Sequence, residues 1–185
     1  MDKIIYFIPS YVKNTGSVTK VMDSNGEEIT VNTKCKSYLN RICREYAVDS
    51  FASKSKYGKL IGAVNCVPIP LTVDLLLMPV KIRKPIAKSD GAMGYVNFHQ
   101  IKDCGGSKTG EVQLIFKNDT KLKVISSYRT LQKSIREAKI IHEHYKKEKG
   151  MIRYADYDEP ITKAELTVLA RLLLNLKNSL NIENI

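Results

Sequence analysis

Lysine and arginine are the residues whose type and spacing in this chain point to chemistry. Residues 79–85 read Pro-Val-Lys-Ile-Arg-Lys-Pro, so that Lys81, Arg83 and Lys84 lie between two prolines. Because proline fixes its own φ and disfavours helix in the residue before it, we expect a stiff, extended arm. Such an arm, with Arg83 at its tip, could enter the minor groove of DNA, where A·T tracts deepen the negative potential. The alternative interpretation is a charged surface loop that only keeps the protein in solution.

A second group of cations lies on a helix predicted over residues 50–64. Its exposed face carries Lys54, Lys56 and Lys59, interleaved with serine hydroxyls. Ammonium and hydroxyl groups donate hydrogen bonds to phosphate oxygens, which positions a protein on nucleic acid without reading its bases. The sequence therefore predicts a phosphate-contacting face, and an ordinary solvated helix face is the alternative. The side chains predicted to be buried on the other face are Phe51, Tyr57, Leu60 and Ile61.

The helix predicted over residues 128–149 offers a third basic surface. Its outer side carries a row of four cations, Arg129, Lys133, Arg136 and Lys139. They could form a recognition helix for the major groove or simply face solvent. The side chains predicted for its inner side are Leu131, Ile135, Ala138, Ile141 and Tyr145. Since nothing else indicates a helix-turn-helix, we rank this helix below residues 79–85 as a site.

Motifs for catalysis or metal binding are weak. Residues 105–110 resemble a phosphate-binding loop, but Lys108 follows Ser107 where that loop requires glycine, so we interpret them as a flexible hairpin connection. The four cysteines include no Cys-x-x-Cys pair, and His142 and His144 fall on different faces of their predicted helix. No nucleophile–base set or carboxylate pair can be assembled. We expect a protein that is not an enzyme and has no cofactor or metal.

The overall composition favours a polyanionic partner. Thirty lysines and arginines against 19 acidic residues give the 185-residue chain a formal net charge of +11. An excess of this size favours nucleic acid or an anionic membrane surface. The apolar runs are far shorter than the roughly 20 residues of a membrane-spanning helix, and residues 1–11 fit a strand better than a signal peptide. We therefore expect a cytoplasmic protein with no membrane association.

Apolar periodicity predicts an α+β fold, a mainly antiparallel sheet with helices in the middle and at the C-terminus. Strands are predicted at residues 3–9, 17–22, 28–31, 74–78, 95–98, 111–116 and 121–125. Helices are predicted at residues 33–46, 50–64, 128–149 and 162–180, the first with Thr33 as N-cap. Pro68 and Pro70 restrict their segment to a sheet edge or a connector. We expect a single domain over residues 1–185, with a small N-terminal sheet (1–32), a basic helix pair (33–65), strands with the basic loop (66–126) and C-terminal helices (127–185).

The last predicted helix carries leucines at alternating spacings of three and four residues. They are Leu166, Leu169, Leu173, Leu176 and Leu180. A period of 3.5 residues makes a dimer seam, although only about two heptads are present. Val168 and Leu172 add apolar surface outside this stripe, which favours a helix buried within its own domain. Both interpretations stay open.

The order of features between Arg41 and Asn97 resembles the ComK family of competence transcription factors. In that family a Ser-Ser-aromatic segment with basic followers leads into Lys-x-Pro-Ile, an apolar strand closed by Pro-Thr, and a strand with Trp-Ile. Here a basic helix pair leads into Val-Pro-Ile-Pro at residues 67–70, an apolar strand ending in Leu-Met-Pro, and Tyr95-Val96 in place of Trp-Ile. With the hairpin at 111–124 and the helix start Ser126-Ser127-Tyr128, the resemblance covers roughly residues 38–140.

The resemblance implies a sequence-specific activator of transcription that binds double-stranded DNA. It implies A·T-rich boxes contacted through phosphates and the minor groove, with Arg83 inserted in the groove and Lys54, Lys56 and Lys59 on phosphates. It also implies a homo-oligomer, dimer or tetramer, in the nucleoid-associated cytoplasm, with RNA polymerase and a Clp protease adaptor as partners. Two other readings stay open: an RNA-binding module, and an interaction protein without nucleic acid that uses the C-terminal leucine helix.

Overall fold

The computed structural model describes residues 4–85, 91–106, 112–150 and 162–179, and the chain divides into two compact units, Met1–Lys149 and Gly150–Ile185. The strands are β1 (Ile4–Val12), β2 (Gly16–Asp23), β3 (Glu28–Val31), β4 (Ile69–Pro70), β5 (Leu76–Lys81), β6 (Met93–Asn97), β7 (Ile101–Gly106), β8 (Val112–Phe116) and β9 (Lys121–Val124). The helices are α1 (Cys35–Glu45), α2 (Ser50–Ile61), the short 3-10 helix η1 (Phe98–Gln100), α3 (Tyr128–Glu148) and α4 (Lys163–Ser179). The predicted α+β class is confirmed.

Within the described residues, the strands of the first unit form two antiparallel sheets. The larger has the order β3-β2-β1-β6-β5-β4, and the smaller has the order β7-β8-β9. The N-terminal strands therefore form no separate small sheet, because β1 pairs with β6 through Tyr6 opposite Val96 and Phe7 opposite Tyr95. β4 is a two-residue edge strand, which agrees with the restriction that Pro68 and Pro70 impose.

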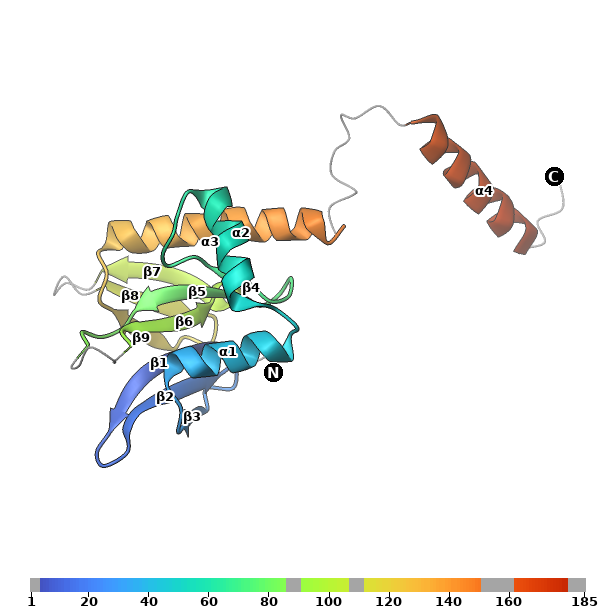
Figure 1. The fold of residues 1–185 in the computed structure, drawn as a ribbon. Coiled ribbons are helices and arrows are strands. Elements are labelled where there is room, and N and C mark those ends of the chain that lie inside the picture. The colour runs from blue at the N-terminus through green and yellow to red at the C-terminus, as the bar shows by residue number, and fades with distance from the viewer. Residues whose placement is uncertain (1–3, 86–90, 107–111, 151–161, 180–185) are drawn as a thin grey trace. The chain divides into compact units, whose positions relative to one another are not determined.

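A β-bulge in β1 supplies side chains to both faces of the larger sheet. The register with β2 shifts between Ile4 and Tyr6, and such a shift interrupts strict alternation. Ile5 and Tyr6 join a core formed with the smaller sheet and α3, whereas Ile4 and Phe7 join a core formed with α1. The larger sheet is thus covered by α1 on one face and by α3 with the smaller sheet on the other (Figure 1).

α1 forms because its apolar side chains recur at helical spacing and find a partner surface. Cys35, Tyr38, Leu39, Ile42 and Cys43 are all buried. The ring of Tyr38 meets Phe7 edge-on, with 5.0 Å between ring centroids. The predicted cap is wrong, since the N-cap is Lys34 and the hydroxyl of Thr33 is buried without a hydrogen-bond partner.

α2 buries Tyr57 and partly buries Ile61 as predicted, but its other two large hydrophobic side chains are exposed. Its buried residues are Ser53, Tyr57 and Gly58, while Phe51 is 82% exposed and Leu60 is 41% exposed. Placing Phe51 and Leu60 in the core is therefore wrong. Small residues allow close approach here, because a Cβ on Gly58 would lie 2.5 Å from the carbonyl oxygen of Ala63. The helix packs closely through Gly58, and the ring of Phe51 is left in solvent.

α3 matches its predicted range closely. The hydroxyl of Ser127 caps it by accepting from the backbone N–H of Thr130 at 3.1 Å. Leu131, Ala138 and Ile141 are buried as predicted, and His142 is buried beside them. β7 was not predicted as a strand: Gly105 and Gly106 belong to it, and residues 107–110 lie outside the described residues.

In the second unit, α4 begins with the N–H of Leu166 bonded to the carbonyl of Thr162. Its apolar side chains from Leu166 to Leu173 are each more than half exposed, and Leu180 lies outside the described residues. Across the parts of the chain that the structure describes, no helix is both long and apolar enough to cross a membrane.

Candidate nucleic-acid interface

α2 is built to carry positive charge. Asp49 is its N-cap, and one carboxylate oxygen accepts the N–H groups of Phe51 at 2.7 Å and Ala52 at 3.0 Å. This carboxylate satisfies the helix terminus, which would otherwise attract an anion. From Ser50 to Ile61 the helix contains no acidic residue. Its surface charge is therefore set by lysine alone.

Lys54 and Lys59 present their charges without an acidic partner among the described residues. Lys54 is partly buried, with its ammonium 6.0 Å from the ring centroid of Tyr95. Burial lowers the pKa of Lys54, and the nearby charge of Lys36 on α1 lowers it further. Lys36 and Lys59 are exposed. Sequence reasoning missed Lys36, because only the packing of α1 beside α2 brings it close to Lys54.

Lys56 lies on α2 but has a different role. Its ammonium forms an ion pair with Glu148 of α3 at 2.6 Å, and the hydroxyl of Tyr57 donates to the same carboxylate at 3.1 Å. The hydrogen bond from Lys56 is the main reason that the pKa of Glu148 is lowered. The predicted group of three lysines is thus divided: Lys56 joins two helices, and Lys54 and Lys59 remain available.

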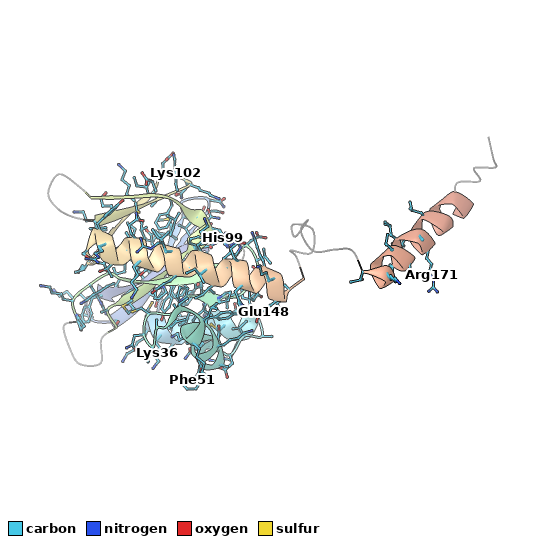
Figure 2. The ribbon with its side chains drawn as sticks, turned by 90° about the horizontal axis from the view of Figure 1, so that it is seen from above. Lys36, Phe51, His99, Lys102, Glu148 and Arg171 are labelled. Atoms are coloured by element: carbon cyan, nitrogen blue, oxygen red, sulfur yellow. The ribbon has the colours of Figure 1, made fainter. Side chains whose placement is uncertain are left out.

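We define the α1–α2 surface by five residues of these two helices: Lys36, Phe51, Lys54, Ser55 and Lys59. Figure 2 shows Lys36 and Phe51 projecting from the same side of the first unit, the side opposite Lys102. Lys20 and Lys102, by contrast, are engaged in ion pairs, with Glu28 at 2.6 Å and with Asp119 at 2.7 Å. The α1–α2 surface can therefore offer its charges to a ligand without first breaking an ion pair.

Residues 79–85 do not form a free arm. Pro79 to Lys81 belong to β5, and the N–H groups of Ile82 and Arg83 both point to the carbonyl of Ala92, at 2.9 and 3.4 Å. The guanidinium of Arg83 donates to the carbonyl of Gly91 and to the hydroxyl of Ser17, each at 3.0 Å. Burial raises the pKa of the Cys35 thiol to about 12, and the positive charge of Arg83 partly opposes this rise. Arg83 is therefore held beside the start of α1, while Lys84 is exposed.

A second basic surface forms where β5 meets the start of α3. The carbonyl of Lys81 accepts the N–H of Ile125 at 2.7 Å, which brings two distant segments together. A surface hollow of about 580 Å³ lies here, with Lys123, Ser126 and Ser127 in its lining. Lys81 and Arg129 are exposed, Arg129 in the first turn of α3. Further along α3, Lys133 pairs with Glu137 at 3.6 Å, and Arg136 and Lys139 are exposed.

Two histidines of the first unit, His99 and His142, lie next to each other. The centroids of their rings are 4.3 Å apart, and Nε2 of His142 lies 3.1 Å from the carbonyl oxygen of Val73. Burial, and secondly His142, lowers the pKa of His99 to about 4. Throughout the described ranges, no group of three histidine, cysteine or acidic side chains could hold a metal ion.

Comparison with known proteins gives no relative for this chain. No family model matches it, and neither a curated protein nor a solved structure matches it significantly.

Proposed function

We propose that the protein is a sequence-specific activator of transcription, similar to the ComK family, that binds A·T-rich double-stranded DNA. The observation that carries this proposal is the α1–α2 surface. It belongs to a chain of net charge +11 and presents Lys36, Lys54 and Lys59, for which the described residues offer no acidic partner. Phosphate contacts of this kind supply most of the affinity of DNA-binding proteins and release counterions.

Within this proposal the two basic surfaces contact different parts of the DNA. Lys54 and Lys59 contact phosphates and set the position of the protein on the duplex. Lys81 and Arg129, from β5 and the start of α3, contact the backbone at a second position. Lys84 and Arg83 lie next to a minor groove, and Arg83 enters the groove by exchanging its bonds to Ser17 and Gly91 for bonds to base edges.

Paired A·T boxes require two copies of the module, so we propose that the protein acts as a dimer or tetramer. The spacing of the leucines of α4 supports this part of the proposal, because leucines that alternate at three and four residues are typical of a helix that pairs with another helix. RNA polymerase and a Clp protease adaptor stay as expectations from the resemblance. The proposed location is the nucleoid-associated cytoplasm.

The test removes the charges of the α1–α2 surface. Lys54→Ala combined with Lys59→Ala should weaken duplex binding about tenfold and reduce the salt slope by about 2, since each lysine neutralises one phosphate. The matched control is Lys102→Ala with Lys121→Ala, which removes the same charge from the smaller sheet. Equal losses in both double variants would contradict the proposal, as would displacement of DNA by duplex RNA at equal concentration.

A further inference from the structure

Phe51 is the one phenylalanine that the fold leaves in solvent. All four phenylalanines of the chain are described, and Phe7 and Phe116 are 0% exposed. Phe98 is partly buried against the core. Phe51 is 82% exposed, although burial of a phenylalanine ring is among the largest stabilising contributions a side chain can make. On the same helix the fold instead buries Ser53, Tyr57 and Gly58.

The surroundings of Phe51 are cationic and polar. Lys54 and Ser55 follow it by three and four residues, and Lys59 by eight, so all three neighbour its face of α2. Leu60, the other exposed apolar side chain of this helix, follows by nine residues and lies about half a turn away. Within α2, Phe51 thus has no large apolar neighbour of the kind that a protein-docking patch contains.

Contacts of the helix fix the backbone position of Phe51. Its own backbone N–H donates to Asp49 at 2.7 Å, and α2 is joined to α3 through the ion pair of Lys56 with Glu148. An exposed aromatic ring on a fixed helix, among lysines that have no acidic partner in the described residues, matches a ligand that is anionic outside and apolar within. The duplex has this character, because its phosphates flank stacked bases that an inserted apolar side chain can separate.

We propose that Phe51 is a wedge that inserts between adjacent base pairs from the minor groove and bends the duplex. This inference rests on the proposed function, because it requires that the α1–α2 surface lies on duplex DNA. Lys54 and Lys59 then hold the phosphates on either side of the opened base step. The bend brings a longer stretch of duplex onto the protein.

The test uses the full-length protein and an A·T-rich duplex in which 2-aminopurine replaces adenine at successive positions. Unstacking at the wedge should raise the fluorescence several-fold at one position. Phe51→Ala should abolish this rise and weaken binding roughly tenfold, the order expected when one base–aromatic stack is lost. Phe51→Leu should keep part of the rise, because leucine also serves as a wedge. The matched control is Ile140→Ala, which removes a 51% exposed apolar side chain from α3.

The outcomes separate the two proposals. If the wild-type protein fails to bind the duplex, the proposed function is overturned, and the wedge with it. If Phe51→Ala binds as tightly as the wild type and leaves the fluorescence unchanged, only the wedge is overturned. If Phe51→Ala instead lowers the molecular mass in sedimentation and leaves the fluorescence unchanged, Phe51 packs against a second copy of the chain, which also overturns the wedge.

Discussion

At the scale of the residue, lysines on one helix have separable roles. Lys56 pairs with Glu148 across two helices, whereas Lys59 is exposed without an acidic partner among the described residues. We expect Lys56→Ala to lower the free energy of unfolding by about 0.5–1 kcal/mol, as for a partly exposed ion pair. Lys59→Ala should leave stability unchanged and reduce the salt slope of DNA binding by about 1. Thermal unfolding and a binding series in salt measure both. If Lys59→Ala lowered the free energy of unfolding and Lys56→Ala did not, both assignments would be wrong.

The histidine pair predicts how stability depends on pH. The pKa of His99 falls on folding from its ordinary 6.5 to about 4, first through burial and secondly through His142, with Asp74 opposing and Lys117 and Lys146 adding to the effect. A histidine with a lowered pKa stabilises the native state only while it is neutral. Its full contribution is therefore present above pH 6.5 and is lost as the pH falls towards 4.

We expect this loss to amount to about 1 kcal/mol, because solvent screens the half-buried ring. Urea unfolding at pH 7, 5.5 and 4.5 should show it in the wild type and show less of it in His99→Asn. His144→Asn serves as the control. A pH dependence in His99→Asn equal to that of the wild type would contradict the assignment. The carboxylate of Glu148 acts in a separate window, since its lowered pKa removes stability only at more acidic pH.

At the scale of the element, the packing of α2 depends on the buried Gly58, which has no side chain. Gly58→Ala would place a Cβ 2.5 Å from the carbonyl oxygen of Ala63, so either the helix or the following turn must move. We expect a loss of about 1–3 kcal/mol from overpacking, larger than the roughly 1 kcal/mol that alanine gains in helix propensity. Chemical denaturation measures the difference, with Ser55→Ala on the exposed face as control. A higher free energy of unfolding for Gly58→Ala would contradict this expectation and show that the turn moves at little cost.

Sequence periodicity predicts the elements whose inward face is apolar. β3 has its predicted bounds, and α3 ends within one residue of them. α1 buries Cys35, Tyr38, Leu39 and Ile42, which recur at helical spacing, together with Cys43. The inward face of α2 was predicted only in part: Tyr57 is buried as expected, but Ser53 and Gly58 complete that face and no hydrophobic pattern selects them. β7 was missed because glycines end it.

The candidate site was predictable only in part. Lys54 and Lys59 are on the surface that the sequence indicates, but the ion pair of Lys56 joins residues 92 apart in the chain. The bond from Arg83 to Ser17 spans 66 residues. Such contacts depend on strand order, and β1 beside β6 is not fixed by any local pattern.

At the scale of the whole molecule, Lys36 of α1 and Phe51 of α2 project from the same side of the first unit (Figure 2), and the charge of Lys36 lies close enough to Lys54 to lower its pKa. The second unit contributes α4, and our proposal of self-association rests on the leucine spacing of this helix. Leu169→Asn with Leu173→Asn should convert the oligomer to a monomer in sedimentation and abolish cooperative binding to paired A·T boxes. Binding to a single box should be unchanged. A lower unfolding temperature for the first unit, with the oligomer intact, would mean that α4 packs on its own chain.

The central claim is that this basic protein reads A·T-rich duplex DNA. The most direct measurement compares binding to two duplexes of equal length across a salt series, one with two A·T tracts a helical turn apart and one rich in G·C. We expect a preference for the A·T duplex of at least about tenfold that persists at about 0.15–0.2 M salt, where nonspecific affinity falls steeply. Equal affinities that vanish together as salt rises would contradict the claim and leave a protein that binds polyanions through charge alone.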